Sequence, residues 1–176
     1  MAVNFSALEF RQRDVAAEIA AVLLETGLAP QYLEIELTES VLMHQTGQVL
    51  GTLNALKALG VGISIDDFGT GYSSLSLLQK FPIHCLKIDR SFISGVADNA
   101  DARSLVRTII AMCESMGLDI VAEGVESLRQ LQVLGEMRCA KAQGYLISHP
   151  VPPESIASTV ATINDLGPWP RTRRPS

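Results

Sequence analysis

The feature that most constrains this chain is the polar residue that closes each of its short apolar segments. These segments alternate with helical patterns and end at Asn4, Glu36, Asp66 with Asp67, Lys87 and Glu123, and more loosely at Gln143. Strands that alternate with helices favour a parallel sheet with helices outside it. In a barrel of parallel strands, all the carboxyl ends meet at one face, where active sites are built. The pattern therefore predicts one polar rim that carries the chemistry.

A plainer interpretation is that strands simply stop where polar loops begin. It explains polarity at the strand ends, but it does not explain why four acids and one lysine recur there. Serine and glycine, which are common in turns, do not dominate these positions.

Hydrophobic spacing predicts the individual elements and their limits. Helices are expected at 12–26, 75–80, 101–117 and 128–134, after the proline pair at 152–153, and between the N-cap Thr46 and Gly60, which lies just past the helix end. Strands are expected at 32–37, 61–65, 85–88, 118–122 and 142–147. In the helix from 101, Leu105, Ile109 and Met112 fall on one face. Residues 1–166 are predicted to form one domain, and the Pro- and Arg-rich residues 167–176 a disordered tail.

Composition excludes several classes of protein. Apolar residues make up 47% and charged residues 19%, which excludes a disordered chain. The formal charge of −5 disfavours DNA or RNA as a partner. No segment approaches the roughly 20 apolar residues that span a bilayer, and no signal peptide is visible. Cys85, Cys113 and Cys139 stand apart in apolar runs, so we interpret them as reduced core residues of a cytoplasmic protein.

The residue types at the predicted rim favour a hard divalent metal. Carboxylates with an amide oxygen form an all-oxygen set, which suits Mg²⁺ or Mn²⁺. Zinc and iron–sulfur sites are disfavoured because the sequence has no paired cysteines or histidines. His44, His84 and His149 are scattered and are interpreted as structural or exposed.

The adjacent acids Asp66 and Asp67 cannot both point inward from a regular strand, because successive side chains point to opposite faces. At a strand end that turns into a glycine-containing loop, one can face the barrel axis while the other reaches in from the rim. Such a pair could serve two metals about 4 Å apart. Alternatively, Asp66 closes the loop through hydrogen bonds to nearby backbone amides. Lys87 could hold a water and stabilise phosphate charge, or it could serve only as an ion-pair partner.

Several ordered motifs resemble those of EAL-domain cyclic-di-GMP phosphodiesterases. They are ELTES (36–40), DDFGTGYSSL (66–75), KIDRSF (87–92), AEGVE (122–126) and QGYLIS (143–148), and Asn4-Phe5-Ser6 resembles an earlier Asn-x-Ser strand end. The resemblance runs from about residue 3 to residue 153. It implies a modified (β/α)8, TIM-like barrel whose first strand is antiparallel. It also implies metal-dependent hydrolysis of cyclic di-GMP to linear pGpG, with two metal ions that are Mg²⁺ or Mn²⁺.

The resemblance also implies roles for individual residues. Asn4, Glu36 and Asp66 would bind one metal, and Asp67 would help to hold the second. Lys87 would orient the attacking water, Glu123 would act as general base or bind the water-bearing metal, and Gln143 would contact the site near the scissile phosphate. Supporting positions are Glu39, Phe68, Gly69, Thr70, Gly71 and Glu126. Capping of nearby helices is the alternative for Glu39 and Glu126.

The sequence departs from the family at its start. The Glu-Ala-Leu motif, whose glutamate binds metal in the family, is absent, and a (β/α)8 barrel typically needs about 250 residues. We therefore expect an incomplete barrel, either a fragment or a shortened gene product, which exposes a sheet edge, associates with itself and has little activity. A non-catalytic cyclic-di-GMP receptor and a protein-interaction scaffold are the alternatives. The resemblance implies a homodimer for the intact domain and further signalling domains in the parent protein.

Overall fold

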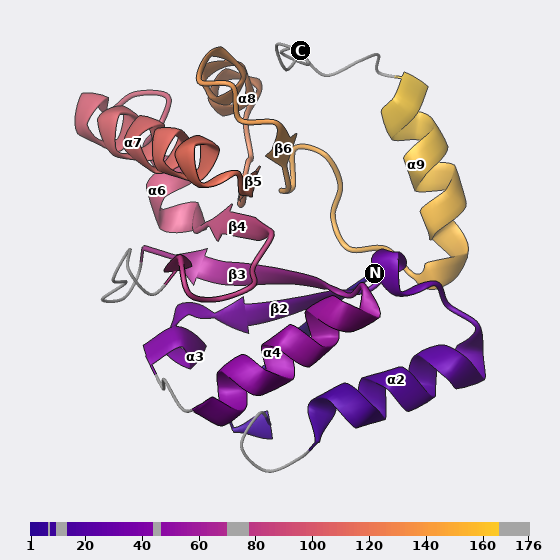
Figure 1. The fold of residues 1–176 in the computed structure, drawn as a ribbon. Coiled ribbons are helices and arrows are strands. Elements are labelled where there is room, and N and C mark those ends of the chain that lie inside the picture. Colours follow the sequence, from indigo (N-terminus) through magenta and orange to yellow (C-terminus); the bar gives the residue numbers. More distant parts are fainter. Residues whose placement is uncertain (7, 10–13, 44–46, 70–77, 166–176) are drawn as a thin grey trace. The chain divides into compact units, whose positions relative to one another are not determined.

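The computed structural model describes residues 1–6, 8–9, 14–43, 47–69 and 78–165. The chain forms two compact units (Figure 1). Unit 1 consists of Met1–Lys87 with Met116–Asp119, and unit 2 consists of Ile88–Ser115 with Ile120–Ser176.

Unit 1 is built on parallel strands that lie in chain order. They are β1 (Ala2–Phe5), β2 (Glu34–Thr38), β3 (Gly62–Phe68) and β4 (Cys85–Ile88, of which the first three residues belong to this unit). The register pairs Asn4 with Glu36 across β1 and β2, and Thr38 with Asp66 across β2 and β3. These parallel pairings confirm the strand arrangement expected from the alternating pattern.

Helices cover the strands of unit 1. They are α2 (Val15–Thr26), the 3₁₀ helix η1 (Pro30–Tyr32), α3 (Glu39–Met43) and α4 (Gly47–Leu59). Asp14 begins α2 by accepting a hydrogen bond from the Ala17 amide. Helices α2 and α4 contact each other, and α4 also contacts β3 (Figure 1). The core contains the strand residues Ile35, Leu37, Ile63 and Ile65 and the helix residues Leu53 and Leu56, all at most 1% exposed.

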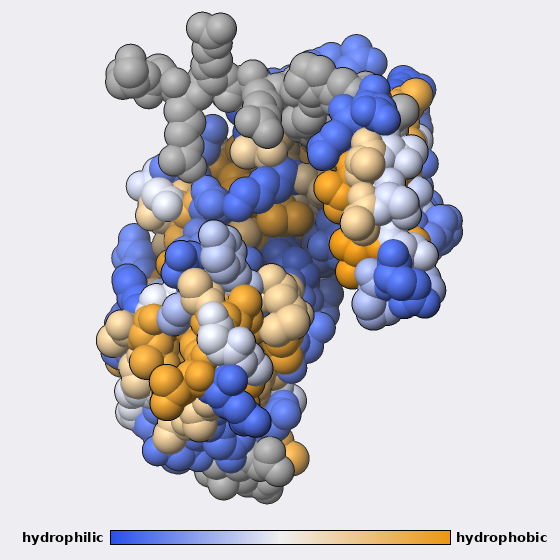
Figure 2. All heavy atoms as spheres, turned by 90° about the vertical axis from the view of Figure 1, so that its right-hand side faces the viewer, coloured by the Kyte–Doolittle hydropathy of each residue, from blue (hydrophilic) through white to orange (hydrophobic). Residues whose placement is uncertain are grey.

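An apolar groove of about 680 Å³ lies between β1 and α2 in unit 1. Its walls include Val3, Phe5, Ile19, Val22, Leu23 and Ile35. In Figure 2, apolar side chains lie among polar ones in the lower part of the view, at the height that α2 has in Figure 1. On this helix Val22 and Leu24 are strongly exposed. Unit 1 therefore leaves apolar surface uncovered beside its first strand.

Unit 2 is mainly helical. Its elements are α6 (Arg90–Ser94), most of α7 (Ala100–Met116), most of β5 (Asp119–Ala122), α8 (Leu128–Glu136), β6 (Lys141–Ala142), η2 (Pro153–Ser155) and α9 (Ile156–Asp165). β5 and β6 pair in parallel. The core of this unit brings together Ile93, Val106, Ile110, Val125 and Leu134, all at most 2% exposed.

Some sequence predictions need correction. The buried face of α7 is formed by Val106, Ile109, Ile110 and Cys113, whereas Leu105 is 43% exposed. The strand expected at 142–147 is only Lys141–Ala142, because the amides of Ile147 and Ser148 turn back onto the Gly144 carbonyl. The five-residue helices α3 and α6 were not predicted. The predicted helix at 75–80 falls partly, and the tail at 167–176 wholly, outside the described residues.

The cysteines match the expectation of a reduced core. Cys85, Cys113 and Cys139 are free and buried. Burial raises the pKa of the Cys113 thiol to about 12 and that of Cys139 to about 11. These two thiols therefore stay protonated near neutral pH and are poor nucleophiles. Within the described part of the chain, no helix has the length and hydropathy needed to cross a membrane.

Candidate functional site

A buried charge cluster lies at the ends of the unit 1 strands. The Lys87 Nζ atom is 2.9 Å from Glu36 Oε1 and 3.2 Å from Asp66 Oδ1. The three side chains are only 6%, 12% and 16% exposed, respectively. Two carboxylates this close together would repel each other, and the ammonium group between them offsets that repulsion. The sequence prediction that these residues share one rim is confirmed for Glu36, Asp66 and Lys87.

The register of the strands explains how the cluster forms. Side chains alternate between faces, so Glu36 on β2 shares a face with its register partner Ser64 on β3, and Asp66 follows two residues later. The apolar residues Leu37 and Ile65, which alternate with them, are fully buried on the opposite face. Asn4 is the register partner of Glu36 on β1 and therefore belongs to the same face. Among the described residues, the buried Ser64 hydroxyl has no hydrogen-bond partner, so this face has unused polar capacity beside Glu36.

Asp67 departs from regular strand geometry, as expected for two adjacent acids that cannot both point inward from a strand. Its φ of 54° is left-handed, a conformation that aspartate adopts more readily than most residues. Its side chain is exposed, and its amide donates a 3.0 Å hydrogen bond to Asp66 Oδ1. Asp66 thus both joins the ion pair and accepts a hydrogen bond within the turn, whereas metal binding by the aspartate pair stays a prediction.

Glu39 connects α3 to the turn after β3. It is 4% exposed, and its Oε2 accepts a 3.1 Å hydrogen bond from the Gly69 amide, 30 residues along the chain. This contact favours the supporting role over helix capping alone. Phe68, between the aspartate pair and Gly69, is buried and anchors the turn. Thr70 and Gly71, also expected to support the site, lie outside the described residues.

Glu123 begins a loop of unit 2 that follows β5. Its amide donates a 3.1 Å hydrogen bond to the Ile88 carbonyl. Two residues later, the Val125 amide donates to the Gln143 carbonyl at 3.0 Å. A Cβ on Gly124 would overlap Arg90, and Gly124 also has a positive φ of 66°, so only glycine fits there. The loop of 123–127 is therefore held closely along its length, and we call it the Glu123 loop.

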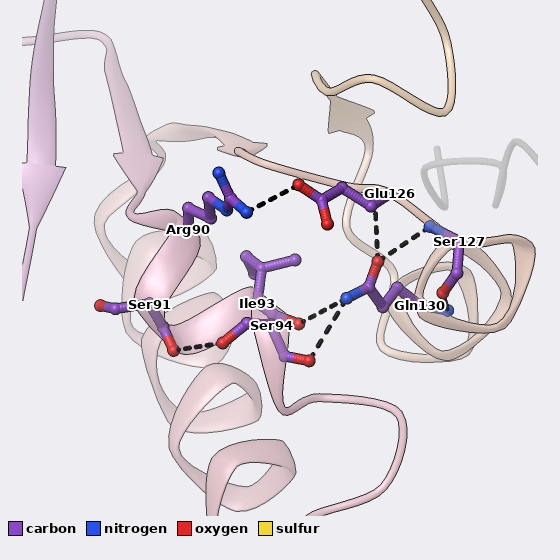
Figure 3. A network of polar contacts seen from close by, with 7 residues as sticks. All are labelled: Arg90, Ser91, Ile93, Ser94, Glu126, Ser127 and Gln130. Atoms are coloured by element: carbon purple, nitrogen blue, oxygen red, sulfur yellow. Dashed lines mark hydrogen bonds and ion pairs between the residues drawn. The ribbon is translucent and has the colours of Figure 1, made fainter.

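Glu126 makes an ion pair rather than a helix cap. Its Oε1 lies 2.8 Å from Arg90 Nη2, and both side chains are substantially exposed (Figure 3). The cap of α8 is Ser127, whose side chain accepts from the Gln130 amide. The capping alternative for Glu126 is therefore wrong. Gln143, the expected contact near the scissile phosphate, is exposed at the end of β6.

The predicted rim is only partly tested. Asn4, Glu36, Asp66, Asp67 and Lys87 belong to unit 1, whereas Glu123, Glu126 and Gln143 belong to unit 2. The joining of the two groups into one site stays a prediction. His84 is confirmed in a structural role, because its Nδ1 lies 2.8 Å from the Ile63 amide, and His149 stacks on Tyr145.

Sequence reasoning missed Arg90 and Gln130. The second had a visible signal, because Ser127-x-x-Gln130 has the pattern of a capping box, and both of its hydrogen bonds are present. Arg90 stands in the motif KIDRSF (87–92), but nothing local predicted its contact with Glu126, because the two residues are far apart in the sequence.

Comparisons with known proteins show which family the motifs belong to. The model of the EAL domain family matches residues 1–150. The bifunctional diguanylate cyclase/cyclic di-GMP phosphodiesterase MucR of Pseudomonas aeruginosa is 44% identical over 161 residues, which are 92% of this chain and 24% of MucR. The PaMucR phosphodiesterase, solved as a c-di-GMP complex, has a TM-score of 0.83 at 44% identity and covers 88% of this chain and 63% of its own.

Two further structures are similar. The EAL domain of Mycobacterium smegmatis DcpA has a TM-score of 0.86 at 37% identity, covering 92% of this chain and 72% of its own. BlrP1 of Klebsiella pneumoniae, solved with manganese and cyclic di-GMP, has a TM-score of 0.79 at 33% identity, covering 85% and 38%. These likenesses confirm the predicted α/β, TIM-like fold class. The chain spans about a fifth to a quarter of the length of the curated relatives it matches.

Proposed function

This chain belongs to the EAL domain family, and we propose that it carries out metal-dependent hydrolysis of cyclic di-GMP to linear pGpG. The observation that carries this proposal is the pair of buried carboxylates, Glu36 and Asp66, held around Lys87 at the ends of parallel strands. MucR, a relative with 44% identity, is a cyclic di-GMP phosphodiesterase by name.

The unit 1 cluster suits a divalent cation. Its two carboxylates already hold one positive group, the Lys87 ammonium, within 3.2 Å. Carboxylate and amide oxygens are the ligands that Mg²⁺ and Mn²⁺ prefer. We propose that Asn4, Glu36 and Asp66 bind one such ion and that Asp67 helps to bind a second. The manganese in the BlrP1 complex supports a divalent ion in this family.

The bound ions would supply an activated water and offset charge on the phosphate oxygens. In our proposal, Lys87 orients the water, and Glu123 accepts its proton or binds the ion that carries it. Gln143 contacts the scissile phosphate group. The water oxygen joins phosphorus while one ester bond breaks, which leaves a 5′-phosphate and a free 3′-hydroxyl. Linear pGpG is the product of that single cleavage.

The supporting residues keep the acids in place. The hydrogen bond from the Gly69 amide to Glu39 fixes the turn that follows the aspartate pair. A carboxylate oxygen of Asp67 lies within 4.8 Å of one of Asp66, which is close enough for the pair to serve neighbouring ions. We propose that Phe68, Gly69, Thr70 and Gly71 serve this turn.

The wider setting is also a proposal. Residues 1–166 form the EAL part, and the intact domain forms a homodimer in the cytoplasm. The parent protein carries further signalling domains, because the curated relatives are four to five times longer than the matched region.

A receptor that binds cyclic di-GMP without cleaving it is the second candidate. One observation favours it: the Glu-Ala-Leu motif, which supplies a metal ligand in the family, does not occur in the 176 residues. A site that lacks one carboxylate could still bind nucleotide while it binds metal too weakly for turnover.

A comparison of two proteins tests these candidates. One is the 176-residue chain, and the other is the same chain preceded by the family's Glu-Ala-Leu strand. Each is incubated with cyclic di-GMP and Mn²⁺ or Mg²⁺, and pGpG is measured by chromatography, with EDTA as the control. We expect the extended protein to form pGpG and the 176-residue chain to form little or none. An extended protein that binds nucleotide and two ions but never cleaves would establish the receptor.

A further inference from the structure

Gln130 is the most fully bonded side-chain amide in the described part of unit 2. It is 8% exposed, and its Oε1 accepts hydrogen bonds from the amides of Glu126 at 2.9 Å and Ser127 at 3.0 Å. Its Nε2 lies 3.4 Å from the Ile93 carbonyl oxygen and 3.3 Å from that of Ser94. Figure 3 shows this amide between the Glu123 loop and α6.

Helix capping accounts for only one of these four contacts. A capping box requires the Oε1 of Gln130 to accept from the Ser127 amide, while Ser127 accepts in return from the Gln130 amide. The bonds to Glu126, Ile93 and Ser94 add nothing to the start of α8. They join the Glu123 loop to α6, whose residues Ser94 and Ile93 lie 36 and 37 residues before Gln130 in the chain.

The two segments that Gln130 joins both lead back to Glu123. The loop begins at Glu123, whose amide is fixed on Ile88. Helix α6 begins two residues after that same Ile88. Gln130 thus closes a ring: Ile88 to Glu123, along the loop to Glu126, through the Gln130 amide to Ile93, and back along α6.

We propose that Gln130 is a positioning residue that fixes the Glu123 carboxylate for hydrolysis, an inference that rests on the proposed function. A neutral amide suits this position because it offers both an oxygen that accepts from the two backbone amides and an NH₂ group that donates to the two carbonyls. A carboxylate would face the Ile93 and Ser94 carbonyl oxygens with negative charge. A thioether of the same length would satisfy neither side.

Two variants separate the contributions of the acceptor and the donor of the Gln130 side-chain amide. Gln130→Met removes both the acceptor and the donor, and Gln130→Glu keeps only the acceptor. The control is Gln132→Met on the same helix, because Gln132 is exposed and its side chain donates a hydrogen bond to Glu136, an exposed residue of the same helix. Hydrogen exchange of the Glu126 and Ser127 amides is measured in the full chain without metal. Rates of pGpG formation are measured in the extended protein.

For Gln130→Met we expect these two amides to exchange about tenfold faster, while the strand amides of unit 1 keep their protection. We expect kcat to fall about 10- to 100-fold with KM nearly unchanged, the usual cost of losing a group that orients another. Gln130→Glu should retain the protection of both amides and lose less activity. Gln132→Met should match the parent protein in every measurement.

Unchanged exchange at Glu126 and Ser127 in Gln130→Met would overturn the proposal, whatever the rates. Faster exchange with an unchanged kcat would also overturn it, because a loosened loop would then be irrelevant to hydrolysis. If the extended parent protein forms no pGpG, the failure is that of the proposed function, and the exchange rates still report whether Gln130 holds the loop. Loss of protection in unit 1 would mark a general folding defect, and Gln130→Glu would then decide the question.

Discussion

The charge cluster of unit 1 and the Glu123 loop of unit 2 are held in opposite ways. Glu36 and Asp66 are fixed by a buried ammonium group. The Glu123 loop is fixed by backbone hydrogen bonds and by the neutral amide of Gln130. A cluster held by a cation can exchange that cation for another, whereas a loop held by neutral bonds keeps its shape whether or not metal is bound. The proposed metal ligands can therefore rearrange when a metal ion binds, whereas the proposed base is held in place before metal binds.

The ion pairs of the two regions also differ in their exposure to solvent. The Lys87 pairs are almost fully buried, whereas Arg90 and Glu126 are 62% and 44% exposed. Exposed pairs are screened by water and contribute little to stability, but removing one partner of a buried pair leaves an uncompensated charge. Removing one partner of an ion pair should therefore lower the stability much more in unit 1 than in unit 2.

The largest expected effect is that of Asp66→Asn in the extended protein. The amide keeps the shape of the side chain but removes its charge, so metal affinity falls. We expect hydrolysis to fall by more than about 100-fold, beyond the range for outer-shell partners. Rates and Mn²⁺ titration calorimetry measure both changes, and circular dichroism checks the fold. Retention of the full rate would show that the charge cluster of unit 1 is not the metal site.

Lys87→Met should have the next largest effect, and it separates stability from catalysis. Without the ammonium, Glu36 and Asp66 repel each other, so the metal-free protein should lose about 3 kcal/mol of unfolding free energy. Excess Mn²⁺ should recover much of that loss, while turnover stays low. Urea unfolding with and without Mn²⁺ measures this, with Lys57→Met, an exposed residue of α4, as the control. Equal stability of variant and parent would contradict the account of the cluster.

Glu126→Gln should have the smallest effect. It removes the exposed ion pair with Arg90 but leaves the Glu126 amide on Gln130, so stability should change by less than about 1 kcal/mol. The rate of pGpG formation should fall by less than about fivefold, as this free-energy limit implies. Thermal unfolding and steady-state kinetics provide the comparison. A loss as large as that of Gln130→Met would mean that the ion pair, rather than the amide, holds the Glu123 loop.

The parts of the fold that the sequence predicted well are those with a clear local pattern. The strand at 85–88 is confirmed at both ends, and the helix at 128–134 begins at its predicted residue and ends two residues later. In α7, Leu105 and Val106 are both apolar, so spacing alone could not decide which of them is buried. Helices α3 and α6 are too short to show a hydrophobic period and follow strands directly, so the spacing did not predict them.

The site residues also divide into those that have a local sequence pattern and those that have none. The residues of unit 1 were predictable because each carboxylate or amine closes an apolar strand, and the parallel register brings Glu36, Asp66 and Lys87 together. Gln130 was not singled out because a glutamine in a polar helix pattern resembles surface. Its importance arises from contacts with Ile93 and Ser94, which no local pattern encodes. The two-residue β6 was overestimated because Gly144, where a Cβ would overlap the Val125 backbone, lies in an apolar run that resembles a strand.

The apolar groove between β1 and α2 has a practical consequence for anyone who measures the stability of this protein. Dyes whose fluorescence rises when they bind apolar surface report unfolding only if they do not bind the native state. A groove of about 680 Å³ with walls such as Val3, Phe5 and Ile19 gives such dyes a place on the folded chain. We expect a bright signal at low temperature and a shallow transition, so intrinsic ellipticity is the sounder measure of melting. Filling the groove, for example by Val22→Phe, should dim the cold signal.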